Sequence, residues 1–229
     1  MPQHIGDDLQ APGRDGRHAR VGHAIATISR GGIVIVTDDE RRENEGDLVM
    51  AASLCTPEAM AFVIRHSSGI VCAPLRRRQA QALRLDPMVA ANDAPLATAF
   101  TVSIDARHGT TTGISAMDRC ATVRQLARST EPSDFVRPGH VFPLVARDGG
   151  VLERPGHTEA AVDLCGLAGL PATGVIGELM NDDGTVMKGA QILEFASRWK
   201  LPHIAIEDLI AYRLAHAASA CASHRALAV

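Results

Sequence analysis

The chain has 229 residues, of which 46% are hydrophobic and 21% charged, and its formal net charge is −3. This length can bury one sizeable core, and the weak charge argues against nucleic acid or anionic membranes as partners. Aromatic residues make up only 3%, and no apolar run is long enough to span a bilayer. The five cysteines include no C-x-x-C pair, which favours a reducing cytoplasm and thiols that pack in the core.

The first half of the chain opens with a polar segment, residues 1–17, that we interpret as a mobile tail. Apolar residues at helical spacing predict a helix that begins at Arg17 and stops at a Gly-Gly pair. Thr56 and Pro57 suit the N-cap and first position of a helix that ends near His66. The other elements expected here are strands over 33–37, 47–53, 69–75 and 100–106, and helices over 76–85 and 115–128.

The second half alternates in the same way. A loop is expected over 131–140, and the following segment, 141–146, is expected to be a strand, or an edge strand because it contains a proline. The remaining elements are a helix over 157–169, a strand over 173–180, a helix over 190–199, a strand over 203–207, a helix over 207–217 and a frayed Ala-rich end over 218–229. This alternation predicts one α+β domain, residues 18–217, with a mixed, twisted β-sheet between two helical layers in a three-layer α/β/α sandwich.

The stretch DDERRENEGD, residues 38–47, places eight charged side chains between two apolar strands. A charge run of this kind is usually a solvated face. Its crowded carboxylates, Glu43, Glu45 and Asp47, are also the hard oxygen ligands that suit Mg²⁺ or Mn²⁺. The pattern alone favours the solvated loop.

A second polar segment, ERPGHTEAAVDL, runs from Glu153 to Leu164 and opens a predicted helix. The N-terminus of a helix beside an arginine is a ready anion site, so Arg154 and Thr158 are candidate phosphate ligands. Thr158 also suits capping of the helix, and His157 places a metal ligand beside the anion site. The alternative is an ordinary helix start.

Two single residues complete the candidates. His140 follows a Pro-Gly pair and is either a turn histidine or a functional one. Glu178 lies in the apolar strand TGVIGELM, where burial would raise its pKa towards the range useful for proton transfer. Alternatively, Glu178 faces solvent at the end of the strand. The chain has neither a P-loop nor a G-x-G-x-x-G motif, so nucleotide binding has no support in the sequence.

Taken together, these segments resemble the 3,4-dihydroxy-2-butanone 4-phosphate synthase family of riboflavin biosynthesis. The matching stretches fall in order over nearly all of residues 20–213, and they are DDERRENEGDLVMAA, HSSGIVC, FTVSIDA, TTTGISAMDR, RPGHVFPL, RPGHTEAAVDL, GELMNDDGT and IEDLIAYR. The resemblance implies a homodimeric lyase with an α/β/α fold that uses Mg²⁺, with Mn²⁺ as an alternative and two ions per site. Its reaction converts D-ribulose 5-phosphate to L-3,4-dihydroxybutan-2-one 4-phosphate and formate by enediolate formation, dehydration and skeletal rearrangement.

The resemblance also implies roles for individual residues. These are metal binding by Glu43 and His157, sugar contacts by Arg42, Asp47 and Glu178, phosphate binding by the loop Arg154, Pro155, Gly156, His157 and Thr158, and acid–base catalysis by His140 and Glu178. Pro155 stands where relatives often carry a small residue, and it removes one backbone donor from the loop. Cys72 is expected near the site as a packing residue. Residues 38–41 are expected to remain a solvated face, while Glu45 either supports Glu43 or points at water.

Many bacterial relatives are fused to GTP cyclohydrolase II, and this chain ends without that domain, so the stand-alone form is expected. One rival interpretation is a non-catalytic sugar-phosphate-binding protein on the same fold. It predicts the loss of metal or acid–base residues, yet all of them are present. A second rival is a metal-dependent aldose–ketose isomerase, which would release no formate.

Overall fold

The computed structural model describes residues 14–226, with the side chains of 16–217. Seven strands form one mixed sheet in the order β4-β5-β3-β6-β2-β1-β7. The pairs β1–β7 and β3–β5 are parallel and the other pairs are antiparallel. The strands are β1 Val34–Thr37, β2 Gly46–Ala51, β3 Cys72–Arg76, β4 Ile104–Ala106, β5 Phe135–Ala146, β6 Gly174–Glu178 and β7 His203–Ala205.

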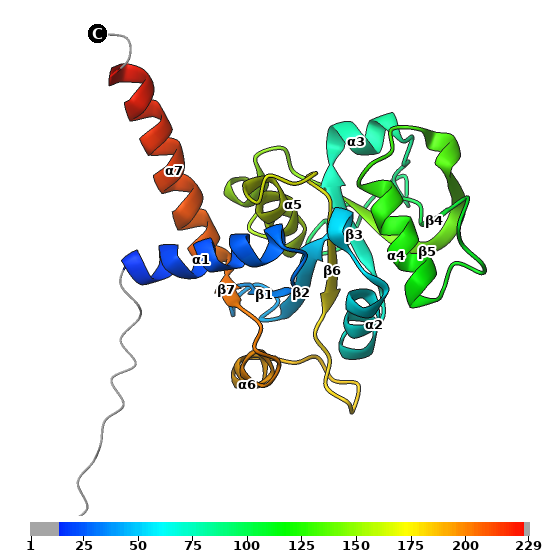
Figure 1. The fold of residues 1–229 in the computed structure, drawn as a ribbon, viewed down its shortest axis with the longest axis horizontal. Helices are drawn as coiled ribbons and strands as arrows, with labels where there is room; N and C mark the ends of the chain where they lie inside the picture. The colour runs from blue at the N-terminus through cyan, green and yellow to red at the C-terminus, as the bar shows by residue number, and fades with distance from the viewer. Residues whose placement is uncertain (1–13, 227–229) are drawn as a thin grey trace, which may run out of the picture.

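Helices cover both faces of this sheet. They are α1 Arg14–Ser29, α2 Pro57–His66, α3 Arg77–Ala82, α4 Ala116–Leu126, α5 His157–Leu167, α6 Ala190–Trp199 and α7 Ile206–Ala226. One buried cluster joins the sheet to α2, α3, α4 and α6, and a second cluster joins the opposite face to α1, α5 and α7. The predicted α+β sandwich with a mixed sheet is therefore confirmed. Figure 1 shows α7 beginning beside α1 and then extending away from the rest of the molecule.

Local sequence explains why these elements begin and end where they do. The strands that flank the charged stretch are short and mostly apolar, and they pair with each other as β1 and β2. Helix α2 begins as predicted, because Thr56 Oγ1 accepts a hydrogen bond from the Ala59 amide at 3.2 Å and Pro57 occupies the first turn. It ends at His66, the residue expected. None of the helices within residues 14–226 has the length and hydropathy needed to cross a bilayer.

The predicted loop over 131–140 is wrong in its second half. Phe135 to His140 belong to β5, which lies between β4 and β3 and is not an edge strand. The Pro-Gly pair suggested a turn, but it lies opposite an irregular step in the β4 register, between Ile104 and Asp105. A β-bulge of this kind accommodates a proline inside a sheet. A Cβ at Gly139 would come within 2.0 Å of the Ile104 backbone, so only glycine allows this close crossing.

Several boundaries also differ from the expectation; among them, β3 begins at Cys72 and α3 ends at Ala82, each three residues from the predicted position. Helix α1 begins at Arg14, so residues 14–17 are helical and do not belong to a tail. Helix α7 continues to Ala226, beyond the expected end at Ala217. Strand β4 contains only the last part of 100–106. Residues 1–13 and 227–229, where a mobile tail and a frayed end were predicted, lie outside the described residues.

Candidate active site

The candidate site is a cavity beside two antiparallel neighbours, β2 and β6. Asp47 and Glu178 are direct partners across this pair of strands. Like charges directly opposite each other destabilise a sheet unless a cation or water separates them. Asp47 is buried, but Glu178 is exposed where it ends β6 at the cavity, so of the two alternatives for Glu178 the solvent-facing one is correct and the buried one is wrong.

The charged stretch forms a folded loop around Asp38. The Asp38 side chain is only 1% exposed and accepts hydrogen bonds from Arg42 Nη1 at 2.7 Å and from the Glu43 amide at 3.1 Å. It also accepts from the Glu45 amide at 2.9 Å. The expectation that Asp38 belongs to a solvated face is therefore wrong. Its carboxylate holds the loop in the conformation that directs Arg42 and Glu43 to the cavity.

The sequence left the role of Glu45 open. Its side chain is half-buried and lies beside the cavity without lining it among the described residues. Burial, with the negative charges of Glu178 and Glu43, raises its pKa. The charges of Glu178 and Glu43 therefore act on Glu45, although its side chain lies outside the lining of the cavity.

Helix α5 begins directly at the site. Its N-cap is Gly156, which makes no side-chain cap, and His157 is the first helical residue. The predicted capping role of Thr158 is therefore wrong, because the helix starts before it, and the Thr158 side chain lines the cavity. A Cβ at Gly156 would lie 2.4 Å from Arg154 Nη1, so a larger residue there would displace the Arg154 guanidinium.

His157 and Asp47 are both buried and meet across the floor of the site. Nδ1 of His157 lies 3.7 Å from Glu43 Oε2 and 4.0 Å from Asp47 Oδ1. His157 Nε2 and Asp47 Oδ1 are buried without a hydrogen-bond partner. Such orphaned buried atoms are unfavourable unless a ligand or water completes them.

These contacts shift the acidity of both groups. Burial raises the pKa of Asp47 to about 7, against the attraction of His157 and with the repulsion of Glu178. Burial alone would lower the pKa of His157, but Asp47 and Glu43 outweigh it and raise the pKa to about 9. The contact of Glu43 with His157 outweighs burial and lowers the pKa of Glu43. The site therefore holds a proton on His157 that a metal would have to displace.

Three residues are grouped closely enough to hold a cation. One ligand atom from each of Asp38, Glu43 and His157 lies within 4.8 Å of the other two. Two carboxylates and one imidazole fit a hard divalent cation that keeps several waters. The sequence indicated Glu43 and His157, and the structure adds Asp38.

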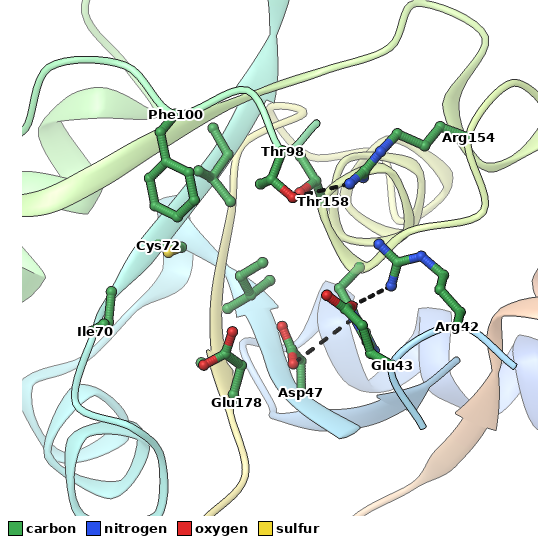
Figure 2. A pocket seen from close by; sticks show the side chains of 14 residues that line it. Arg42, Glu43, Asp47, Ile70, Cys72, Thr98, Phe100, Arg154, Thr158 and Glu178 are labelled. Atoms are coloured by element: carbon green, nitrogen blue, oxygen red, sulfur yellow. Dashed lines mark hydrogen bonds and ion pairs between the residues drawn. The ribbon is translucent and has the colours of Figure 1, made fainter. Parts of the chain in front are cut away.

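The opposite end of the cavity is basic. Arg154 Nη1 donates to Glu159 Oε2 at 2.7 Å, and the Glu159 side chain is only 1% exposed. Arg154 Nη2 donates to Leu96 O and to Thr98 Oγ1, each at 3.1 Å. Figure 2 shows Arg154 beside Thr98 and Thr158, apart from the row formed by Glu178, Asp47 and Glu43. One cavity therefore presents a fixed guanidinium and an acidic group at separate places.

Most of the candidate residues line this cavity, and the ones that do are Arg42, Glu43, Asp47, Arg154, His157, Thr158 and Glu178. Among the described residues, its lining does not include Pro155, Gly156 or His140. His140 lies in β5 before Phe142, the partner of Cys72, and its side chain is 41% exposed. Its Nδ1 lies 2.7 Å from Asp105 Oδ2, and its amide donates to Asp105 Oδ1 at 2.9 Å.

Comparison with known proteins decides the family. The model of the 3,4-dihydroxy-2-butanone 4-phosphate synthase family matches residues 22–212. A solved structure of such a synthase, in complex with two magnesium ions, is 47% identical with a TM-score of 0.82. It covers 84% of this chain, which in turn covers 95% of that structure. This chain belongs to the 3,4-dihydroxy-2-butanone 4-phosphate synthase family.

This chain spans different fractions of the length of its relatives. The synthase of Edwardsiella ictaluri is 52% identical over 197 residues, which are 86% of this chain and 90% of that protein. A chloroplastic bifunctional riboflavin biosynthesis protein of Arabidopsis thaliana is 52% identical over 209 residues, which are 90% of this chain but 38% of that protein. The chain therefore spans less than half of that bifunctional relative.

Several residues of this synthase fold escaped the sequence reasoning. Asp38 directly follows a buried strand, and that position is the signal that was missed. Asp105, which holds His140, is a carboxylate inside the strand pattern FTVSIDA and is buried. Thr98 and the other wall residues Ile70, Phe100, Leu144 and Ile176 carry no local signal. Cys72 also lines the cavity, and burial raises the pKa of its thiol, which agrees with a packing role.

Proposed function

We propose that this chain is a magnesium-dependent 3,4-dihydroxy-2-butanone 4-phosphate synthase, which converts D-ribulose 5-phosphate to L-3,4-dihydroxybutan-2-one 4-phosphate and formate. The observation that carries the proposal is the meeting of Glu43, Asp47, His157 and Arg154 at one cavity from separate segments of the chain. Family membership of a chain at 52% identity to a synthase supports the same activity.

The acidic end of the cavity fits the metal. Glu43 and His157 would hold Mg²⁺, with Mn²⁺ as an alternative, and Asp38 is close enough to take part. His157 Nδ1 faces Glu43 and Asp47, and the unpartnered Asp47 Oδ1 supports this assignment, because a cation or one of its waters would complete it. Bound there in one or two copies, the metal would polarise the ketone and hydroxyl oxygens of the sugar.

The remaining residues would bind the substrate and move its protons. Arg154 and Thr158 would hold the phosphate at the N-terminus of α5, where free backbone amides favour an anion. Pro155 has no N–H to donate, and the Gly156 amide already donates to Arg154 O at 2.8 Å. The side chains therefore make more of the contact with the phosphate. Arg42 and Asp47 would contact the sugar hydroxyls. Glu178, exposed at the cavity, is placed to take and return a proton.

The test is to incubate the purified chain with D-ribulose 5-phosphate and Mg²⁺ and to assay formate. The synthase should release formate in step with the loss of substrate, and chelation of the metal should stop it. An isomerase would interconvert the sugar without formate, and a binding protein would leave it unchanged. Either of these results would overturn the proposal.

The homodimer belongs to this proposal, and His140 offers a way to test it. His140 is half-exposed, is held by Asp105, and does not line the described cavity of its own chain. A second copy would let His140 act at the neighbouring cavity as the second acid–base residue. Mixing His140→Ala chains with Glu43→Ala chains should then restore activity, because a mixed dimer keeps one intact site. If the mixture of the two variants is as inactive as each variant alone, the two chains of a dimer do not share residues at their sites.

A cytoplasmic location is also part of the proposal. The described cysteines Cys55, Cys72, Cys120 and Cys165 are free and buried, as expected in a reducing compartment. If the chain works in the cytoplasm, moving it to an oxidising compartment should inactivate it. Full activity there, in a chain that carries intermolecular disulfides, would contradict a cytoplasmic location.

A further inference from the structure

Two cysteines outside the site contact each other, although they are far apart in the sequence. Cys55 follows a short 3-10 turn, Ala52–Leu54, and Cys120 lies in the middle of α4. Both are buried, with exposed fractions of 0% and 3%. The Cys120 thiol donates to the Cys55 carbonyl oxygen at 3.3 Å, and Arg124 Nη1 donates to the same oxygen at 3.3 Å. This shared acceptor fixes the two residues side by side.

The two thiols also interact directly and are not equivalent. The Cys55 thiol donates to Thr56 O at 3.5 Å, and contact with this side chain lowers the pKa of Cys120, against burial and with help from the positive charge of Arg124. The same contact, together with burial, raises the pKa of Cys55. Cys120 is therefore the better nucleophile, and Cys55 holds the proton beside it.

The other described cysteines lack this arrangement. Cys72 lines the cavity, and burial raises the pKa of its thiol. Cys165 lies in α5 itself, where burial raises its pKa to about 12 and its thiol donates to Thr173 O at 3.5 Å. Within the described part of the chain, Cys55 and Cys120 are thus the two thiols placed to react with each other.

We propose that Cys55 and Cys120 form a reversible intramolecular disulfide when the chain meets a small peroxide. The Cys120 thiolate attacks one peroxide oxygen, the O–O bond breaks, and the leaving oxygen departs as water while Cys120 becomes a sulfenic acid. The Cys55 sulfur then attacks the Cys120 sulfur, the S–O bond breaks, and a second water leaves. The two thiols lose two electrons and the peroxide gains them. A dithiol reductant reverses the change.

The cross-link would join two segments that support the wall of the cavity. The neighbour of Cys120, Arg119, donates to Gly69 O at 2.9 Å, next to the lining residue Ile70. Asp118 accepts from the Thr111 amide at 3.0 Å and holds the loop before α4. A covalent bond from α4 to Cys55 closes a long loop and restricts the unfolded chain, so it should raise the thermal midpoint.

Peptide mapping tests this directly on the full chain. Hydrogen peroxide is added to the reduced protein, free thiols are alkylated under denaturing conditions, and trypsin is added without reductant. Trypsin places Cys55 in peptide 43–65 and Cys120 in peptide 120–124. The expected product is these two peptides joined and lighter by two hydrogen atoms, lost again after dithiothreitol. Sulfinic acid at Cys120 with Cys55 still alkylated, or no change at either, would overturn the proposal.

Two variants sharpen the result. Cys120→Ser should abolish the cross-link and the rise in thermal midpoint, whereas Cys72→Ala, which removes the thiol at the cavity, should keep both. A cross-link that instead joins Cys55 to Cys72 would refute the pairing. An oxidised wild-type chain that melts below the reduced chain would show that the pair is not positioned for a disulfide.

Discussion

Arg154 at one end of the cavity donates to Glu159, Leu96 and Thr98, whereas His157 Nε2 and Asp47 Oδ1 at the other end have no hydrogen-bond partner. The basic end is built in advance by the chain itself. The acidic end gathers like charges, and its orphaned atoms make it complete only with a ligand. This comparison indicates at which end a ligand changes the free energy most. A bound cation relieves the repulsion between like charges at the acidic end, whereas a bound phosphate only adds contacts to a basic end that is already rigid.

The largest expected effect comes from removing a ligand at the acidic end. Glu43→Ala should lower kcat for formate release by about a thousandfold, since a bound metal is worth several kcal/mol in the transition state. Circular dichroism should show an intact fold, because Glu43 is half-exposed. Glu40→Ala, an exposed glutamate of the same loop, is the matched control and should keep its activity. Near-normal turnover in Glu43→Ala would refute the metal assignment.

The pH dependence of stability probes the acidic end without any metal. A pKa of about 7 for Asp47, above its ordinary 3.8, means that the folded chain holds this proton more tightly than the unfolded chain. Folding stability should therefore fall as the pH rises from about 4 to about 7, by on the order of 3 kcal/mol relative to Asp47→Asn. Urea unfolding of both proteins across this range measures the difference.

Exposed Asp93→Asn is the matched control for that experiment and should follow the wild type at every pH. Saturating Mg²⁺ should reduce the loss, because a cation stabilises ionised Asp47. Parallel curves for wild type and Asp47→Asn would show that this carboxylate is not strained.

A smaller effect is expected at the basic end. Arg154→Lys keeps the charge but cannot reach Glu159 and Thr98 at once with a planar fork. Losing one charge-assisted hydrogen bond, about 2 kcal/mol, should raise KM for ribulose 5-phosphate about thirtyfold with little change in kcat. Steady-state kinetics give the two constants separately. Arg147→Lys, an exposed arginine near this end, serves as control, and an equal effect there would contradict a specific phosphate contact.

The smallest effect should come from Thr98→Val, which removes one of the three acceptors that position Arg154. We expect a loss of about 1 kcal/mol in the free energy of unfolding and a rise of a few fold in KM. Thr101→Val, which leaves Arg154 untouched, should change stability without changing KM. If Thr98→Val alters kcat more than KM, Thr98 takes part in chemistry and is not merely a positioning residue.

The sequence allowed the prediction of features whose cause is local. Alternating apolar strands and helices gave the layers, and Thr56 and Pro57 marked the start of α2 correctly. Glu43, Asp47 and His157 were noticed because they lie in polar segments at strand and helix ends, and their expected roles came from the family resemblance.

The features that the sequence did not reveal depend on contacts between distant segments. Asp38 was expected to be solvated because its hydrogen-bond donors, Arg42 and two backbone amides, reach it only in a loop conformation that residue spacing does not predict. The segment 135–140 contains a Pro-Gly pair, which usually marks a turn, yet a bulge against β4 keeps it in the sheet. The partnership of His140 with Asp105, and of Arg154 with Thr98, arises only when the strands and loops assemble.

The protons released on metal binding test the central claim about the acidic end. His157, with a pKa of about 9, is protonated at neutral pH and must lose its proton to bind a metal, and Asp47 must ionise beside it. Titration of Mg²⁺ by calorimetry at about pH 7.5, in buffers of different ionisation enthalpy, should show the release of roughly one proton per site. Glu43→Ala should lose most of the binding. Tight binding without proton release would contradict a metal site built on His157.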